Sequence, residues 1–173
     1  EKYGFEKAYG SYEELLTDPE IEAVYIPLPN TMHYEWTIKA LKSGKHVLCE
    51  KPLAPTEAQA KEMFAAAEEN HVYLMEAFAY QHSPYLTAIR EEIKNGTIGD
   101  VRYMESAYIT SDYNKNNIRM RRDTLGGCTY DLGVYNTSLI LRTLAEEPTE
   151  IRAIASFSEE KIDKLTSVIM EYG

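Results

Sequence analysis

The sequence predicts an α/β chain: a parallel sheet with covering helices over residues 1–80, followed by an α+β region with a mainly antiparallel sheet over residues 81–173. Between residues 11 and 78, short apolar runs alternate with helix-like segments, which is the order that builds parallel sheets with right-handed crossovers. After residue 78 the first strand candidate alternates apolar with polar residues, as in sheets with one solvated face. We therefore expect a boundary near residues 78–83.

Helix-start signals support the helices of the first region. Ser11 stands three residues before Glu14, and Thr56 stands three residues before Gln59, so each pair can form a capping box that satisfies free amides at a helix start. Gly44 is a residue that readily adopts the left-handed conformation that closes a helix. The expected helices cover residues 11–18, 31–43 and 56–70.

Three short apolar runs predict the strands of the parallel sheet: Ala23–Pro27, His46–Cys49 and Val72–Phe78. Strands and helices in this order form half of a doubly wound, Rossmann-type sheet, and ligands of such sheets bind beyond the carboxyl ends of the strands. The turn at Pro29-Asn30 follows the first strand, and Glu50-Lys51-Pro52 follows the second. These turns therefore mark the expected ligand-binding edge.

The second region begins with a helix that Ser83-Pro84 opens and Asn95-Gly96 closes. The remaining expectations are an antiparallel strand over Val101–Ile109, a polar irregular stretch over 111–122, a helix over 129–145, and a hairpin of strands over 151–157 and 165–172.

The composition narrows the function classes. The 173 residues include 18 Lys plus Arg and 28 Asp plus Glu, a formal net charge of −10 that repels phosphate backbones and anionic lipids. Nucleic acid and membrane surfaces are therefore not expected as principal partners. Cys49 and Cys128 stand far apart without ligand spacing, so neither a disulfide framework nor a metal site is expected. The sequence has no apolar run of roughly 18 residues and no signal-peptide layout, so we expect a cytoplasmic protein.

Lys51 is the first candidate for chemistry. It follows a predicted buried strand, and Pro52 biases it toward an extended backbone. A cation in this place, with Glu50 beside it, can polarise a hydroxyl or a carbonyl. The alternative is a surface lysine before a loop, the more common role of an isolated Glu-Lys-Pro tripeptide. The position after the second strand favours the functional interpretation.

Pro29, Asn30 and His33 stand at the mouth of the first strand. Asn30 and His33 can hydrogen-bond a nicotinamide ribose or amide. The alternative is that Asn30 or Thr31 caps the following helix and that His33 lies in its exposed first turn. Spacing alone favours this capping interpretation.

The stretch from Gly126-Gly127 to Tyr135 is the most informative. Two glycines let the backbone approach a ligand closely. Asp131 and Tyr135 are four residues apart and therefore share one face of a helix. In the functional interpretation, Tyr135 donates and accepts a proton beside the Lys51 cation, and Asp131 holds a substrate hydroxyl. The alternative is a core stripe with a capping carboxylate.

Four further polar residues have two interpretations each. Arg119, Arg121 and Arg122 can bind an anion or a polyol hydroxyl, or belong to a solvated loop. His82 can face the same cleft or be a structural histidine. No Ser-His-Asp or Cys-His nucleophile arrangement and no metal ligand set is evident in the sequence.

In their order, these motifs resemble the Gfo/Idh/MocA family, the family of glucose-fructose oxidoreductase and inositol dehydrogenase, over the whole chain. The resemblance rests on Tyr12–Leu16, Ala23–Pro27, Pro29–His33, Gly44–Pro52, Met75–Phe78 and Gly126–Tyr135. In this family a dinucleotide-binding Rossmann domain precedes an α+β domain with a large open sheet. The resemblance thus implies that residues 1–80 are the carboxyl-terminal part of the first domain, and residues 81–173 the amino-terminal part of the second.

The resemblance also implies an activity. Family members transfer a hydride between NAD or NADP and a hydroxyl-bearing carbon of a sugar, a polyol or a trans-dihydrodiol. Lys51, Asp131 and Tyr135 match the catalytic positions, and a tyrosine at position 135 resembles the dihydrodiol and xylose dehydrogenase branch. The cofactor-binding positions of the family match Pro29, Asn30, His33, Glu50, Lys51 and Pro52. A homo-oligomer formed through the outer face of the second sheet is also implied.

Two departures from the family pattern leave alternatives open. Gln81 stands where related sequences often have Arg, and no G-x-G-x-x-G loop occurs in the 173 residues. We therefore expect an interior piece of a longer protein. The competing interpretations are a non-catalytic dinucleotide- or sugar-binding regulator and an inactive fragment of the enzyme.

Overall fold

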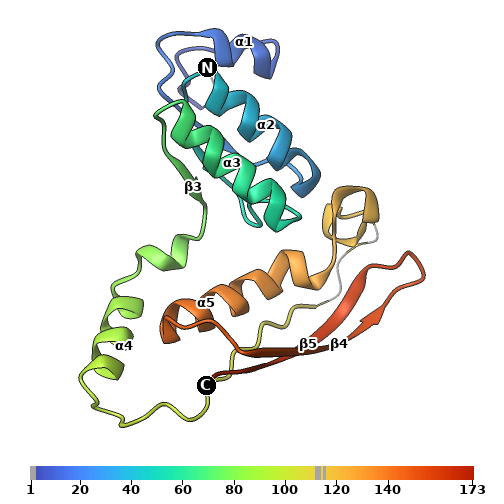
Figure 1. Cartoon of the computed structure of the whole chain (residues 1–173). Helices are drawn as coiled ribbons and strands as arrows, with labels where there is room; N and C mark the ends of the chain where they lie inside the picture. The colour runs from blue at the N-terminus through green and yellow to red at the C-terminus, as the bar shows by residue number, and fades with distance from the viewer. Residues whose placement is uncertain (1–2, 112–113, 115) are drawn as a thin grey trace. The chain divides into compact units, whose positions relative to one another are not determined.

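The computed structural model describes residues 3–111, 114 and 116–173. The chain divides into two compact units: unit 1 comprises residues 1–28 and 32–77, and unit 2 comprises residues 29–31 and 78–173. Unit 1 contains a parallel sheet, and unit 2 contains an antiparallel hairpin (Figure 1). The predicted fold class is confirmed. No helix in the described ranges is long and apolar enough to cross a bilayer.

Unit 1 follows the predicted alternation of helices and strands. Its elements are α1 (Tyr12–Thr17), β1 (Ala23–Ile26), α2 (Asn30–Lys42), β2 (His46–Cys49), α3 (Glu57–Glu69) and β3 (Leu74–Glu76). The strands pair in parallel in the order β1-β2-β3, with Ile26 opposite Cys49 and Cys49 opposite Glu76. The three strands therefore end at one edge of the sheet. The third strand is shorter than the apolar run that predicted it.

The helix-start signals act as predicted. The Ser11 side chain accepts a hydrogen bond from the Glu14 amide at 3.1 Å, and the Thr56 hydroxyl accepts one from the Gln59 amide at 3.3 Å. The Glu14 carboxylate reaches back to the Gly10 amide at 2.8 Å, one residue before the cap. Both helices therefore begin where their caps predict.

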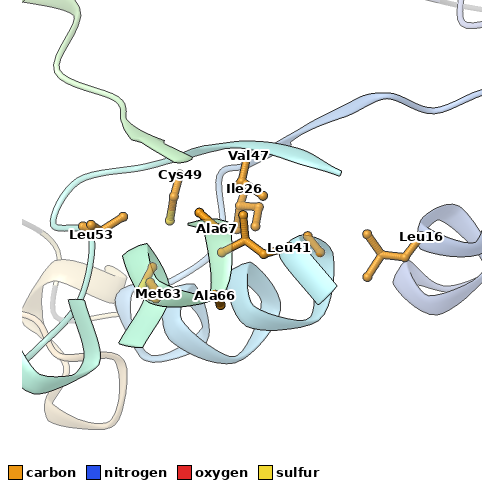
Figure 2. Close-up of a cluster of buried hydrophobic side chains, with 10 residues drawn as sticks. Leu16, Ile26, Leu41, Val47, Cys49, Leu53, Met63, Ala66 and Ala67 are labelled. Atoms are coloured by element: carbon orange, nitrogen blue, oxygen red, sulfur yellow. The ribbon is translucent and has the colours of Figure 1, made fainter. Parts of the chain in front are cut away.

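The core of unit 1 lies between the sheet and its helices (Figure 2). It is formed by Leu16, Ile26, Ala40, Leu41, Val47, Cys49, Leu53, Met63, Ala66 and Ala67. On the opposite sheet face Tyr25 is 54% exposed, so within the described residues the helices cover one face only. The prediction that β1 is a buried strand is therefore wrong for this face, because no described helix packs there.

Unit 2 begins with a 3₁₀ turn (Ala79–His82) and α4 (Pro84–Lys94), which Ser83 caps through its side chain. Two further 3₁₀ turns follow at Ile118–Met120 and Arg122–Thr124. A π-helical turn (Thr129–Gly133) leads into α5 (Val134–Leu144). The strands β4 (Glu150–Phe157) and β5 (Asp163–Glu171) form an antiparallel hairpin, as predicted.

One predicted strand is wrong. Residues 101–109 form no strand, although their apolar and polar residues alternate. A strand needs a hydrogen-bonded neighbour, and in the described residues β4 and β5 pair only with each other. Tyr103 and Ile109 are accordingly exposed. The predicted irregular stretch over 111–122 lies partly outside the described residues, and its described part contains one of the 3₁₀ turns.

Candidate active site

Lys51 is the second residue after the end of β2, at the carboxyl edge of the sheet in unit 1. Lys51 is half-buried, and its backbone amide donates to Glu50 Oε2 at 3.2 Å. Glu50 Oε1 accepts a hydrogen bond from the Tyr25 hydroxyl at 2.6 Å. The Lys51–Pro52 peptide bond is cis. The Glu50 carboxylate is thus fixed between the neighbouring strand and the main chain that carries Lys51.

Two further side chains position the loop after Lys51. His33 Nδ1 lies 2.8 Å from the carbonyl oxygen of Pro52, and His33 Nε2 lies 2.7 Å from that of Leu28. Glu76 Oε1 accepts a hydrogen bond from the Leu53 amide at 2.8 Å. His33 is fully buried, so the alternative of an exposed first-turn histidine is wrong. Its imidazole connects the loops that follow β1 and β2.

Pro29 and Asn30 belong by their contacts to unit 2. The Asn30 side-chain amide donates to the carbonyl oxygen of Leu125 at 2.9 Å. Leu125 has a left-handed backbone conformation with φ of 54° and directly precedes the glycine pair. In this structure Asn30 therefore supports the glycine loop.

The two glycines of the pair Gly126-Gly127 lie against protein atoms that leave no room for a side chain. A Cβ atom at Gly126 would lie 2.4 Å from the carbonyl oxygen of Arg119. Gly127 has φ of +120°, and a Cβ atom there would lie 2.0 Å from Asp163 Oδ1. The glycine pair thus packs the loop at Arg119 on one side and the start of β5 on the other.

Asp131 and Tyr135 lie on either side of the junction between two helix types. Asp131 is part of the π-helical turn, and Tyr135 is the second residue of α5. Single π turns within helices are rare overall, but those that occur are often found at functional sites. Asp131 Oδ1 accepts a hydrogen bond from Arg119 Nε at 3.0 Å, and the Asp131 side chain is 12% exposed. Arg119 is one of the three arginines that the sequence places before the glycine pair, and it binds the Asp131 carboxylate.

The Tyr135 ring is surrounded by aromatic side chains of unit 2. Its centroid lies 5.5 Å from Phe78, 6.3 Å from Tyr80 and 6.0 Å from Tyr108. The Tyr80 hydroxyl donates to Ser138 Oγ on α5 at 2.7 Å. Gln81, the departure from the family pattern, also donates to Ser138 Oγ, at 3.3 Å. No pattern in the sequence marks Ser138 on α5, and only the fold brings Tyr80 and Tyr108 to this helix.

The remaining candidates lie at the surface of unit 2. Arg121 forms an ion pair with Asp123, and Arg122 is exposed. His82 is exposed at the end of its 3₁₀ turn. No cluster of three or more metal-ligating side chains occurs among the residues that the structure describes.

Asp163 is a further residue of this region that the sequence alone does not single out. Its Oδ2 atom accepts hydrogen bonds from the Thr129 amide at 2.7 Å and from the Thr129 hydroxyl at 2.6 Å. It also accepts bonds from Thr166 Oγ1 at 3.1 Å and Cys128 Sγ at 3.0 Å. Burial works against the charged carboxylate, but the hydrogen bonds from Thr129, Cys128 and Thr166 outweigh it and lower the pKa of Asp163. No local pattern marks Asp163, because its helix partners lie more than thirty positions earlier in the chain.

Comparison with known proteins extends over both units. Residues 1–78 match the family model described as "Oxidoreductase family, NAD-binding Rossmann fold". Residues 86–173 match the model of the "GFO/IDH/MocA C-terminal domain". An uncharacterized oxidoreductase of Rhizobium meliloti is 36% identical over 170 residues, which are 98% of this chain and 51% of that protein.

Two similar proteins have named activities. The trans-1,2-dihydrobenzene-1,2-diol dehydrogenase of Xenopus laevis is 36% identical over 168 residues, 96% of this chain and 51% of that enzyme. The crystal structure of KijD10, a 3-ketoreductase from Actinomadura kijaniata in complex with NADP and TDP-benzene, matches with a TM-score of 0.80 at 32% identity. That match covers 88% of this chain and 47% of KijD10. The chain spans about half the length of the curated relatives it matches. With both domain models matched in order along the sequence, the chain belongs to the Gfo/Idh/MocA family of oxidoreductases.

Proposed function

We propose that the protein carrying this chain is an NAD- or NADP-dependent dehydrogenase. It transfers a hydride between the nicotinamide and a hydroxyl-bearing carbon of a sugar, a polyol or a trans-dihydrodiol. The similarity to a dihydrodiol dehydrogenase and to a 3-ketoreductase with bound NADP supports this substrate class and this cofactor.

The observation that carries the proposal is the setting of Asp131 and Tyr135. A largely buried carboxylate bound by Arg119 stands four residues before a tyrosine whose ring packs against aromatic side chains. A phenol with apolar neighbours and a fixed carboxylate on the same helix suit a reaction that moves a hydroxyl proton. Lys51, after β2, supplies the matching cation in unit 1.

The residues at the carboxyl edge of unit 1 fit a nicotinamide cofactor. A half-buried lysine and a carboxylate fixed by Tyr25 follow β2, where cofactors of doubly wound sheets bind. We propose that Pro29, Asn30, His33, Glu50, Lys51 and Pro52 bind the cofactor, with His33 acting by holding the loops after β1 and β2. When bound, the nicotinamide donates or accepts the hydride.

Each catalytic residue has a proposed task. Lys51 polarises the substrate oxygen and lowers the cost of charge on it. Tyr135 takes the hydroxyl proton during oxidation and returns it during reduction. Asp131, held by Arg119, accepts a hydrogen bond from a neighbouring substrate hydroxyl and so orients the reacting carbon.

The test is a hydride-transfer assay on the protein at its full natural length. Nicotinamide absorbance is followed with NAD⁺ and NADP⁺ against trans-1,2-dihydrobenzene-1,2-diol and a panel of aldoses and polyols. Tyr135→Phe is expected to lower kcat by about 10²- to 10⁴-fold, the usual contribution of a proton-transfer group. Lys51→Ala is expected to lower kcat by about 10²- to 10³-fold, the usual cost of losing a group that stabilises charge on the reacting oxygen. Lys61→Ala and Tyr103→Phe are matched controls, because both side chains are exposed and their described partners, Glu57 and Glu105, are not candidate residues.

The outcomes separate the proposed enzyme from a binding protein. Hydride transfer that survives in the controls and is lost in both site variants supports the dehydrogenase. Saturable binding of NADH or NADPH, measured by fluorescence, without hydride transfer to any substrate would instead support a non-catalytic regulator. Equal activity of Tyr135→Phe and the wild type would remove Tyr135 from the proposed mechanism.

We also propose that the protein is a homo-oligomer. One face of the β4–β5 hairpin contacts the π-helical turn through Thr166. The other face presents Ile154, Leu165 and Ile169, which are 75%, 64% and 72% exposed. Several large apolar side chains on one sheet face are typical of a surface that another protein chain covers.

A further inference from the structure

Four residues of unit 2 form what we call the Asp163 cluster: Cys128 and Thr129 at the start of the π-helical turn, and Asp163 and Thr166 on β5. All the donors of the cluster meet one oxygen, Asp163 Oδ2, at distances between 2.6 and 3.1 Å. Charge-assisted hydrogen bonds of this length are about twice as strong as neutral ones. The Asp163 carboxylate is therefore firmly held at the start of β5.

The second carboxylate oxygen explains the glycine beside it. Any Cβ atom at Gly127 would overlap Asp163 Oδ1, at 2.0 Å. Because hydrogen bonds fix the carboxylate, it cannot swing away from a larger residue. The glycine thus leaves the space that lets β5 contact the start of the helix.

The cluster replaces a cap that the helix itself lacks. The π-helical turn that begins at Thr129 has no side-chain cap from its own flanking residues. The first amides of a helix need acceptors, and a negative charge there is favourable. Asp163 supplies both from a distant strand, through the Thr129 amide. The direction and register of this helix start therefore depend on β5.

We infer that Asp163 is a positioning residue for Asp131 and Tyr135, which follow Thr129 by two and six residues. This inference rests on the proposed function. Asp163 touches neither residue in any described contact and acts through the helix start that carries both. A shift of about 1 Å in a reacting group can cost about a hundredfold in rate, so fixing the helix start matters for catalysis.

The test replaces the carboxylate with its uncharged isostere, Asp163→Asn, in the protein at its full natural length. Asp100→Asn is the matched control, because Asp100 is an exposed aspartate of the same unit that pairs only with the exposed Arg102 in the described contacts. Thr129→Val is the milder second variant. It removes the hydroxyl donor, keeps the amide donor and retains the methyl group that packs near Gly133.

Two readouts are measured at a temperature where circular dichroism shows each variant folded. We expect Asp163→Asn to lower kcat on trans-1,2-dihydrobenzene-1,2-diol, or on the best panel substrate, by about tenfold to a hundredfold while the KM for the nicotinamide cofactor stays within twofold. Amide hydrogen exchange of the peptide 128–138 is expected to accelerate by about tenfold. Asp100→Asn is expected to change neither quantity.

Every outcome bears on the inference. An unchanged kcat in folded Asp163→Asn overturns it, even if the variant melts earlier, and so does a parallel loss of kcat and cofactor affinity, which indicates general destabilisation. If Asp163→Asn does not fold, Thr129→Val decides by the same criteria. If the wild type transfers no hydride, the proposed function fails, and hydrogen exchange of the peptide 128–138 alone then decides whether Asp163 holds the helix start.

Discussion

Both the backbone conformation and the surroundings of Gly127 require a glycine. Its φ of +120° disfavours every side chain, and its missing Cβ makes room for the Asp163 carboxylate. We expect Gly127→Ala to lower the free energy of unfolding by more than the roughly 1–3 kcal/mol that an unfavourable backbone conformation alone costs. Urea denaturation at neutral pH measures the difference from the wild type.

The control for this prediction is Gly99→Ala. Gly99 also has a positive φ, +71°, but nothing lies within 4 Å of the position where its Cβ would stand. This variant therefore reports the backbone cost without the steric overlap. Equal losses of stability in the two variants would show that the contact between Gly127 and Asp163 adds nothing.

The two cysteines are expected to differ in reactivity. Burial raises the pKa of Cys49 to about 11, and Cys49 is fully buried in β2. Burial, followed by its hydrogen bond to Asp163, also raises the pKa of Cys128, which is only partly buried. Because their pKa values are raised, both thiols stay protonated at pH 7. Since the thiolate is the reactive form, both are expected to react slowly with thiol reagents.

A titration with a disulfide reagent such as DTNB checks this order. In the native protein Cys128 is expected to react slowly and Cys49 not at all, until denaturant exposes it. Raising the pH should accelerate the reaction of Cys128 in the native protein, because a larger fraction of its thiol is then ionised. Fast native labelling of Cys49, mapped by mass spectrometry, would contradict the buried environment of β2.

Among the elements, α3 carries the clearest division between core and surface. Met63 is fully buried against the sheet, whereas its neighbour Phe64 is 49% exposed. We expect Met63→Ala to cost about 2–5 kcal/mol of unfolding free energy, the range for emptying a packed core site. Phe64→Ala removes more atoms but should cost clearly less, and chemical denaturation of both variants measures this. A larger loss of unfolding free energy for Phe64→Ala than for Met63→Ala would show that Phe64, and not Met63, is the side chain packed in the core.

Local signals predicted most elements, and their failures have a physical cause. Ser11, Thr56 and Ser83 cap helices through neighbouring amides, so their role is visible in a few residues of sequence. The alternation over Val101–Ile109 is equally local, but a strand also needs a partner, and none pairs with it in the described part of the chain. Likewise, the π-helical form of residues 129–133 has no composition signature.

At the scale of the whole molecule, residues far apart in the sequence form the candidate site. The glycine pair and Asp131 could be singled out because they stand close together in the chain. Asp163 could not, since only the packing of β5 against the π-helical turn brings it to Thr129. The same holds for the aromatic rings of Phe78 and Tyr108 beside Tyr135. Sequence patterns therefore predicted the catalytic candidates but not the residues that support them.

The last prediction concerns assembly and follows from the register of the hairpin. Ser156 pairs with Leu165 and Arg152 pairs with Ile169, so both apolar residues lie on the face that also presents Ile154. The Ala155–Thr166 pair lies on the opposite face, which contacts the π-helical turn. An apolar face of this kind is stabilised when a second copy covers it, because that removes the side chains from water.

We expect the double variant Leu165→Lys, Ile169→Lys to dissociate the oligomer, since it would bury two charges without partners in the contact. Light scattering of the protein at its full natural length measures the mass. Ile109→Lys is the control, because Ile109 is exposed and lies outside the hairpin. A wild-type monomer, or an oligomer that survives the double variant, would show that this face is not the interface. Dissociation without loss of circular dichroism would assign the outer face of β4 and β5 to assembly and leave the helix-facing side to the candidate active site.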